Sequence, residues 1–264
     1  MIRVLTAIVL IALLACTLWM PPYAFVVVLA IFLALGWSEY EALAAEAGAA
    51  PLRGLGALLA ISVAVSFALP DPQAPAVALG ASALLAALGG LAAGAKHPLL
   101  VVRRTAATLG GVCWLGLLPG FTVAIRFGDD GVTLIALLFA AVSSGDIAAY
   151  YGGTLLGRHP LAPGLSPKKT IEGTICGLLA SGAGGALVAH YWLPGAGWSP
   201  GLAVGLMLGV AGQAGDLFES AFKRAANAKD SSRLLPGHGG ILDRLDGLLF
   251  AGGVLYGAVF FGLF

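Results

Sequence analysis

The sequence alternates between long apolar stretches and short polar breaks. A helix needs about 20 largely apolar residues to cross a bilayer. By this criterion the sequence has nine candidate stretches: residues 4–19, 22–37, 54–70, 75–94, 105–125, 131–151, 172–193, 201–220 and 246–264. The pattern predicts an all-α, polytopic integral membrane protein with about nine transmembrane helices. The first two stretches are short, so one broken hairpin is an alternative for that part.

The positions of the basic residues test this count. With nine spans, alternate loops lie on opposite sides, and one side collects 13 of the 14 lysines and arginines, leaving only Arg126 on the other. Basic loops stay in the cytoplasm. We therefore expect a cytoplasmic N-terminus and an external C-terminus. A cleaved signal peptide is the alternative for residues 1–20, although no small-residue cleavage site precedes Pro21.

Composition excludes several classes of protein. Hydrophobic residues make up 59% of the chain and charged residues 10%, against about 25% charged in soluble domains. Mean hydropathy is +0.95. These values exclude a soluble enzyme, a disordered chain and a nucleic-acid binder. The chain has three cysteines, all inside apolar stretches, which excludes a secreted domain stabilised by disulfides. Glycine and alanine in 75–94 and 172–188 indicate close helix packing, through which a homodimer is an open alternative.

The charges gather in two segments expected on the cytoplasmic side, 143–172 and 216–246. Together they hold 15 of the 27 charged residues. We expect residues 1–140 to form N-terminal transmembrane helices with a lipid-facing and packing role. Residues 141–264 are expected to form the catalytic region, with cytoplasmic loops at 152–171 and 221–245.

In the second segment, Asp216, Glu219 and Lys223 have the spacing of one helix face at the inner end of a span. An unpaired carboxylate near lipid is costly, by about 2–3 kcal/mol, unless a cation binds it. An ion pair of Asp216 with Lys223 or Arg224 is the structural alternative.

A glycine-rich turn, Pro236 to Gly240, follows and leads into the last span. With few side chains around His238, its backbone can approach an anion closely, and Gly239 and Gly240 can direct N–H groups at it. Asp243 and Asp246 share a face of the next helical turn. Each aspartate alone could be simple compensation of the helix dipole.

The carboxylates and cations of this segment together indicate phosphate chemistry. Asp216, Asp243 and Asp246 are hard oxygen ligands suited to Mg²⁺. They flank a group of phosphate-binding cations: Lys223, Arg224, Lys229, Arg233 and Arg244. Metal-assisted phosphoryl or nucleotidyl transfer needs this combination.

The first segment contains a second candidate anion site. Ser166-Pro167 has the pattern of a helix start, which would place Lys168 and Lys169 in the first turn, where the helix dipole disfavours cations. Both lysines are then expected to contact a bound anion; topology signals are the alternative. Asp146 and Tyr150 lie upstream, at the inner end of a span.

These residues resemble the signature of the phosphatidate cytidylyltransferases, also called CDP-diacylglycerol synthases. The matching positions are Asp146 to Gly173, the lead-in Asp216 and Glu219, then Ser220, Lys223, Arg224, Lys229, Asp230 and the run from Leu235 to Asp246. The resemblance is specific over about 143–250 and rests on hydropathy alone over 1–140.

The resemblance implies an Mg²⁺-dependent enzyme that joins CTP and phosphatidate into CDP-diacylglycerol and pyrophosphate, with a second cation as an option. It implies membrane lipids but no nucleic acid as partners, and a bacterial inner membrane with the site facing the cytoplasm. Asp216, Asp243 and Asp246 would hold metal, and these aspartates with Lys223 and Lys229 would be catalytic. Substrate phosphates would meet the remaining candidates: Asp146, Ser166, Lys168, Lys169, Arg224, His238, Gly239, Gly240 and Arg244.

Two other functions stay open at this stage. A CTP-dependent kinase of polyprenol or another lipid alcohol has a similar membrane architecture, but would use the γ-phosphate of CTP. An ion-coupled transporter belongs to a different class, and would be expected to place isolated ionisable groups near the bilayer midplane.

Overall fold

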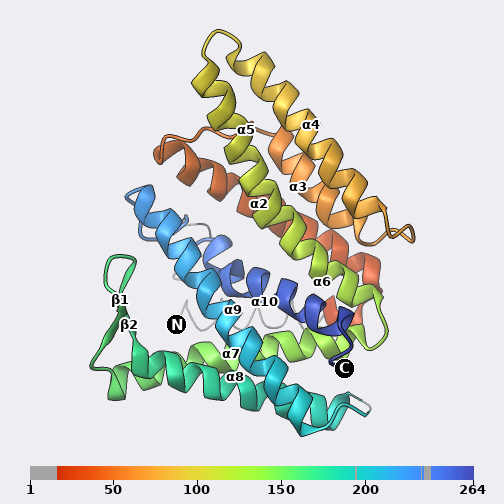
Figure 1. Ribbon diagram of the computed structural model, residues 1–264, viewed down its shortest axis with the longest axis vertical. Coiled ribbons are helices and arrows are strands. Elements are labelled where there is room, and N and C mark those ends of the chain that lie inside the picture. The colour runs from red at the N-terminus through yellow and green to blue at the C-terminus, as the bar shows by residue number, and fades with distance from the viewer. Residues whose placement is uncertain (1–16, 194, 233, 235–238) are drawn as a thin grey trace. The chain divides into compact units, whose positions relative to one another are not determined.

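The computed structural model describes residues 17–193, 195–232, 234 and 239–264 (Figure 1). Its elements in chain order are α2 (Pro22–Glu46), α3 (Leu55–Ser66), α4 (Ala74–Gly94), α5 (Pro98–Val112), a π-helical turn (Cys113–Leu117), α6 (Leu118–Phe127), α7 (Gly131–Leu156), β1 (Pro160–Ala162), β2 (Ser166–Thr170), α8 (Ile171–Trp192), α9 (Trp198–Ala225) and α10 (Leu242–Phe260).

The second to ninth apolar stretches are confirmed as helical, because each overlaps one of these helices. Within the described part of the chain, six helices are long and apolar enough to cross a membrane: α2, α4, the continuous run from Pro98 to Phe127, α7, α8 and α9. A polytopic membrane protein is therefore indicated. The first stretch lies mainly outside the described residues, and the count of nine spans stays a prediction.

Several polar breaks are themselves helical, which corrects the expected loop boundaries. Residues 38–46 were expected to separate two spans, yet α2 continues through them to Glu46. The first expected loop, 152–171, begins with the last turn of α7, which ends at Leu156. The second, 221–245, begins with the end of α9 at Ala225 and ends within α10. Polar residues are compatible with a helix wherever their side chains reach water or a partner.

A short β-hairpin adds to the expected all-α fold. Strands β1 and β2 pair antiparallel, with Pro160 opposite Thr170 and Ala162 opposite Ser166. The hairpin connects the end of α7 to the start of α8 (Figure 1).

The chain divides into two compact units. Unit 1 comprises residues 1–127 and 222–244, and unit 2 comprises 128–221 and 245–264. Helices α9 and α10 thus contribute residues to both units. The expected division of function, with packing before residue 141 and catalysis after it, does not concern these compact units and stays a prediction.

Unit 1 has an aromatic and aliphatic core centred on α2. The Tyr40 ring lies 5.3 Å from Trp37, 5.2 Å from Phe222 and 6.1 Å from Trp114, measured between ring centroids. Trp114 belongs to the π-helical turn. The Tyr40 hydroxyl donates to the Ala107 carbonyl at 2.5 Å, so the polar tip of this buried ring has a partner.

Unit 2 packs its helices through small residues, as the glycine and alanine content predicted. A Cβ atom on Gly185 would lie 2.6 Å from the Gly201 carbonyl oxygen and 2.7 Å from the Gly205 Cα, so the α8 and α9 backbones are nearly in contact. Ser144 on α7 donates to the Ala180 carbonyl on α8 at 3.0 Å. Small residues with an occasional hydroxyl are typical of packing between helices in a membrane.

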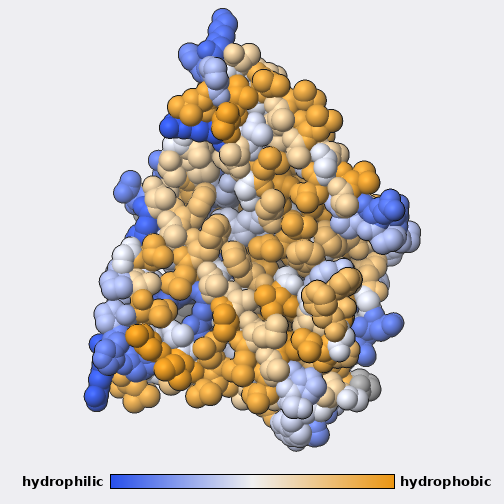
Figure 2. Space-filling model, viewed as in Figure 1, coloured by the Kyte–Doolittle hydropathy of each residue, from blue (hydrophilic) through white to orange (hydrophobic). Residues whose placement is uncertain are grey.

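Large hydrophobic side chains are exposed on many helices, including Val77, Leu84 and Leu88 on α4 and Leu179 on α8. Figure 2 shows hydrophobic residues over much of the visible face, with hydrophilic residues in a few separate groups. A surface of this kind suits a lipid environment.

Candidate active site

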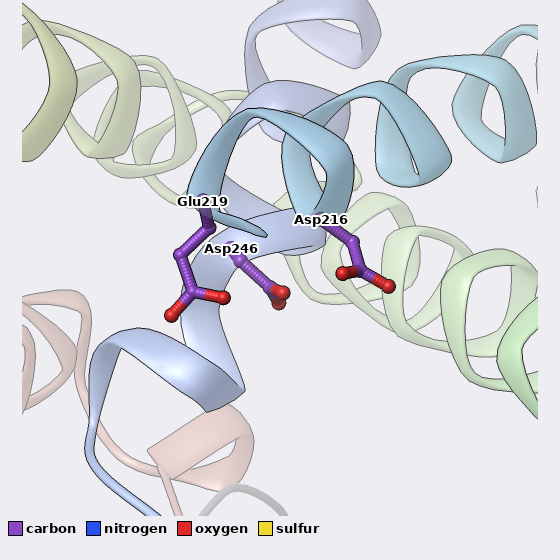
Figure 3. A group of neighbouring side chains, drawn as sticks. All are labelled: Asp216, Glu219 and Asp246. Atoms are coloured by element: carbon purple, nitrogen blue, oxygen red, sulfur yellow. The ribbon is translucent and has the colours of Figure 1, made fainter. Parts of the chain in front are cut away.

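Three carboxylates of unit 2 come together where the C-terminal half of α9 meets the start of α10. Asp216 and Glu219 lie three residues apart on α9, and Asp246 lies near the start of α10 (Figure 3). One oxygen from each falls within 4.8 Å of the other two. The close approach of α10 depends on Gly215, where a Cβ atom would collide with the Asp246 carbonyl group.

This donor set fits a divalent cation. Asp216 and Asp246 are half-buried and Glu219 is only 1% exposed. Three carboxylates at such separation repel one another, and a hard cation that accepts oxygen ligands relieves the repulsion. The spacing of the sequence predicted that Glu219 and Asp216 share one face of a helix, but Glu219 was not among the predicted metal ligands. Its membership in the cluster is a new finding.

A lysine from the hairpin lies next to the cluster. The Lys169 ammonium group is 2.6 Å from Asp216 Oδ2, while the Ser220 hydroxyl lies 3.4 Å from Asp216 Oδ1. Asp246 Oδ1 accepts the Gly247 N–H at 2.8 Å. The cluster therefore has a cation within reach that can also contact a phosphate oxygen.

The expected helix start at Ser166-Pro167 is wrong. Residues 166–170 form β2, and α8 begins at Ile171. The N-cap is Thr170, whose hydroxyl accepts the Gly173 N–H at 3.1 Å. Threonine in an extended conformation is a good N-cap, and a two-stranded hairpin tolerates the missing N–H of Pro167 at its edge.

The strand also changes what the two adjacent lysines can do. Successive side chains of a strand point to opposite faces. Lys169 is half-buried against Asp216, whereas Lys168 is exposed. The phosphate-binding roles of Lys168 and of the half-buried Ser166 stay predictions.

A second acidic site lies in unit 1, around Asp243. One carboxylate oxygen accepts a bond from the Lys223 ammonium at 2.6 Å. The other accepts the Gly240 N–H at 2.7 Å, the Ser231 N–H at 3.0 Å and the Ser231 hydroxyl at 2.9 Å. The Asp243 side chain is 8% exposed.

These donors set the protonation state of Asp243, which precedes the predicted span 246–264. Burial acts to raise its pKa, but the N–H groups of Gly240 and Ser231 and the bond and charge of Lys223 act in the opposite direction. The pKa of Asp243 is consequently lowered from its usual value. Asp243 is thus an ionised group enclosed by protein donors, and its predicted metal role remains to be tested.

The described end of the glycine-rich turn shows why glycine is needed there. Gly239 has a φ of +79°, and a Cβ atom on it would collide with Asp243 Oδ2. Any other residue at 239 would be strained and would also displace the carboxylate. His238 lies outside the described residues.

The remaining predicted site residues lie on the surface of their units. Arg224 donates to the Ala228 carbonyl at 3.3 Å. The exposed members of the predicted set are Asp146, Lys168, Arg224, Lys229 and Arg244. Exposure leaves them accessible to a substrate, and their individual roles stay predictions.

One carboxylate in unit 1, that of Glu39, was not predicted from the sequence to belong to this site. Glu39 was read as part of a polar break after the second span, but it lies on α2 and is 4% exposed. It accepts bonds from Ser231, Ser232, Ile241 and Leu242. Acidic residues directly after an apolar stretch were the available signal, but Glu41 and Glu46 follow in the same run, so the pattern does not single out Glu39.

The fold and the site define a polytopic helical membrane protein with a carboxylate cluster that can hold a cation and with lysines beside two acidic groups. A family model described as the cytidylyltransferase family matches residues 1–261, and the chain belongs to this family.

Curated relatives carry the name phosphatidate cytidylyltransferase. A protein of Brucella suis is 51% identical over 144 residues, which is 53% of this chain and 53% of the relative. A protein of Helicobacter pylori is 38% identical over 148 residues, or 55% of each chain. These matches span about half the length of the relatives. A protein of Synechocystis is 32% identical over 286 residues, covering 96% of this chain and 94% of the relative.

Proposed function

We propose that the protein is a CTP:phosphatidate cytidylyltransferase, which converts CTP and phosphatidate into CDP-diacylglycerol and pyrophosphate. The observation that carries the proposal is the cluster of Asp216, Glu219 and Asp246, with Lys169 beside Asp216, in a member of the cytidylyltransferase family. The names of the curated relatives support the same reaction.

Asp216, Glu219 and Asp246 would hold Mg²⁺, because carboxylate oxygens are its preferred protein ligands. When bound, the ion would neutralise charge on the triphosphate of CTP. Asp243 was also predicted as a ligand. Its enclosure by Lys223, Ser231 and Gly240 supports an alternative, in which it orients those groups. Whether a second cation takes part is left to metal titration.

In the proposed reaction, a phosphate oxygen of phosphatidate attacks the α-phosphorus of CTP. A new P–O bond forms as the bond between the α-phosphorus and its bridging oxygen to the β-phosphorus breaks, and pyrophosphate leaves. A phosphate monoester is already ionised at neutral pH, so no strong general base is needed. Lys169 and Lys223 would contact phosphate oxygens and stabilise the developing charge.

The other basic residues complete the proposed binding surface. Arg224, Lys229 and Arg244 would bind phosphate oxygens, and Lys168 would bind the nucleotide or the lipid phosphate. His238 would contact phosphate or pyrophosphate. The predicted topology places all of these residues on the cytoplasmic side, where CTP is available, in a bacterial inner membrane. A homodimer stays a separate prediction, tested by the mass of the detergent-solubilised protein.

Labelled CTP tests the proposal directly. Purified protein in detergent is incubated with Mg²⁺, with CTP labelled at either the α- or the γ-phosphate, and with either phosphatidate or a polyprenol as the acceptor. A cytidylyltransferase transfers the α-label to lipid and releases the γ-label as pyrophosphate. Transfer of γ-label to a lipid alcohol would instead identify a kinase. Substrate uptake into proteoliposomes without CTP turnover would identify a transporter.

A further inference from the structure

Among the described residues, the Glu39 carboxylate accepts its hydrogen bonds from one distant segment of chain. Oε1 accepts the Ser232 hydroxyl at 2.6 Å and the Ile241 N–H at 2.9 Å. Oε2 accepts the Ser231 hydroxyl at 2.9 Å and the Leu242 N–H at 2.9 Å. Each oxygen thus binds one hydroxyl and one backbone N–H. The carboxylate joins the two ends of the segment that contains the glycine-rich turn.

Two of these donors belong to the start of α10. Leu242 is the first residue of this helix, and the first N–H groups of a helix have no partner within it. Glu39 supplies that partner and places a negative charge at the positive end of the helix dipole. A buried carboxylate is costly unless hydrogen bonds replace its water. The Ser232 hydroxyl and the N–H groups of Ile241 and Leu242 meet this requirement for Glu39, and the single proton of the Ser231 hydroxyl is shared between Glu39 and Asp243.

The same segment carries Asp243 and its lysine. The Ser231 hydroxyl lies 2.9 Å from Glu39 Oε2 and also 2.9 Å from Asp243 Oδ2. A Cβ atom on Gly240 would collide with the Ser231 hydroxyl and with both Glu39 oxygens. The two carboxylates therefore close around Ser231 and Gly240. Asp243 in turn holds the Lys223 ammonium at 2.6 Å.

The residue after Glu39 contacts the same region through its ring. Tyr40 stacks on Phe222 with a centroid separation of 5.2 Å and an angle of 17° between ring planes. Phe222 directly precedes Lys223. Two consecutive residues of α2 therefore contact both the start of α10, at Ile241 and Leu242, and the ring next to Lys223.

We infer that Glu39 is a positioning residue for phosphate binding. It holds Gly239 to Leu242 in place and, through Ser231 and Asp243, sets the position of the Lys223 ammonium. The inference rests on the proposed function in that these groups are taken to contact CTP phosphates. It assigns a task to the N-terminal half of the chain, which the sequence had linked to packing and lipid contact alone.

Glu39→Gln tests this inference with little change in shape. An amide has one acceptor oxygen and one NH₂ donor. Whichever way it is oriented, its NH₂ faces the N–H of Ile241 or Leu242, so one backbone donor loses its acceptor. Glu41→Gln is the matched control. It makes the same change two residues later, where the carboxylate pairs with the exposed Arg53 at 2.7 Å.

Two measurements are made on the full-length protein in detergent. Steady-state kinetics with α-labelled CTP separate kcat from the KM of each substrate. Hydrogen–deuterium exchange reports on peptides that cover residues 239–243. We expect Glu39→Gln to raise the KM for CTP about tenfold, since displacement of a binding group by about 1 Å has effects up to 10²-fold. The KM for phosphatidate should change much less, because the groups that Glu39 positions are taken to contact CTP. Exchange in 239–243 should be faster.

Glu41→Gln should match the wild type in both measurements. Glu39→Asp, which keeps the charge, should recover part of the loss. If Glu39→Gln lowers the yield or the melting temperature while the folded fraction keeps its KM for CTP, the residue is merely structural and the inference is overturned. If Glu39→Gln fails to fold, Ser232→Ala removes one donor only. Ser232→Ala should raise the KM for CTP in the same direction, and an unchanged value overturns the inference.

Failure of the inference differs from failure of the proposed function. If the wild-type protein transfers no α-label, the proposed function is wrong. Glu39→Gln is then still compared with the wild type in two measurements. These are hydrogen–deuterium exchange in residues 239–243 and the protection that CTP gives against thermal unfolding. Unchanged exchange and unchanged protection by CTP would overturn the inference, whereas faster exchange together with weaker protection by CTP would support it.

Discussion

The two units use the same chemical group in opposite ways. In unit 2, the oxygens of Asp216, Glu219 and Asp246 lie within 4.8 Å of one another. In unit 1, the carboxylates of Glu39 and Asp243 are enclosed by hydroxyl, N–H and ammonium donors. Carboxylates that lie close together repel one another and favour binding of a cation. Carboxylates surrounded by hydrogen-bond donors instead hold in place the segments that carry those donors.

This contrast matters most for Asp243. Sequence spacing groups Asp243 with Asp246, since the two are three residues apart on one helix. The contacts separate them, because Asp246 belongs to the three-carboxylate cluster and Asp243 to the network of Lys223, Ser231 and Gly240. Two acidic residues on one helical turn can therefore have different tasks, and substitutions should distinguish them.

The largest expected effect follows from removal of a charge from the cluster. Asp216→Asn or Asp246→Asn should lower the transfer of α-label from CTP to lipid by more than about 10²-fold, because loss of even an outer-shell partner of a metal ligand costs 10–100-fold. The protein should still fold, since neutralising one of three adjacent carboxylates relieves repulsion. Asp129→Asn, at an exposed position of the same unit, is the control. Near-normal turnover at saturating Mg²⁺ in the Asp216 variant would refute the metal assignment.

A second substitution sharpens the comparison between the units. Asp243→Asn should lower kcat/KM by about 10–100-fold, because Lys223 and Gly240 lose the charge that orients them. The Mg²⁺ concentration for half-maximal activity should stay the same, whereas Glu219→Gln should raise it. The measurement is an Mg²⁺ titration of both variants beside the wild type. A raised Mg²⁺ requirement in Asp243→Asn would restore the sequence-based assignment of this residue to the metal.

The sequence could predict the elements that depend on local pattern. Apolar stretches gave the helices, and the i, i+3 spacing of Asp216 and Glu219 put both on one face. It could not predict contacts made across the chain. Glu39 and Ser231 are 192 residues apart, and nothing in the neighbourhood of either indicates the other.

The hairpin shows a different kind of failure. Ser166-Pro167 fits the pattern of a helix start, but Thr170 fits an N-cap equally well, and local preference alone does not choose between them. Pairing with residues 160–162 decides the conformation. The error mattered for function, because it placed both lysines on one turn of helix, whereas the strand directs only Lys169 toward Asp216.

This difference between the lysines gives the third prediction. Lys169→Ala should lower kcat/KM about tenfold, since a charge-assisted bond is worth about 1.5–3 kcal/mol. Lys168→Ala, the matched control on the opposite face, should lower it less than about threefold, because an exposed charge is screened by solvent. The two variants are compared at low and high salt. Equal losses would show that the strand does not separate the two side chains in function.

The smallest expected effect concerns stability in unit 1. The pKa of Asp243 is lower in the folded protein than in the unfolded chain, where it is about 3.9. The ionised carboxylate therefore stabilises the fold at pH values above about 3.9. This contribution is lost as the pH falls through the pKa of the folded state. Asp243→Asn should therefore be less stable than the wild type at pH 7 by about 1.5–3 kcal/mol, the contribution of hydrogen bonds to a charged group. The difference should shrink below about pH 4. Denaturant unfolding in detergent at pH 7 and at low pH measures both values. A difference that is independent of pH would mean that the Asp243 network acts through shape alone, and the contrast with the cluster of unit 2 would then rest on the kinetic variants.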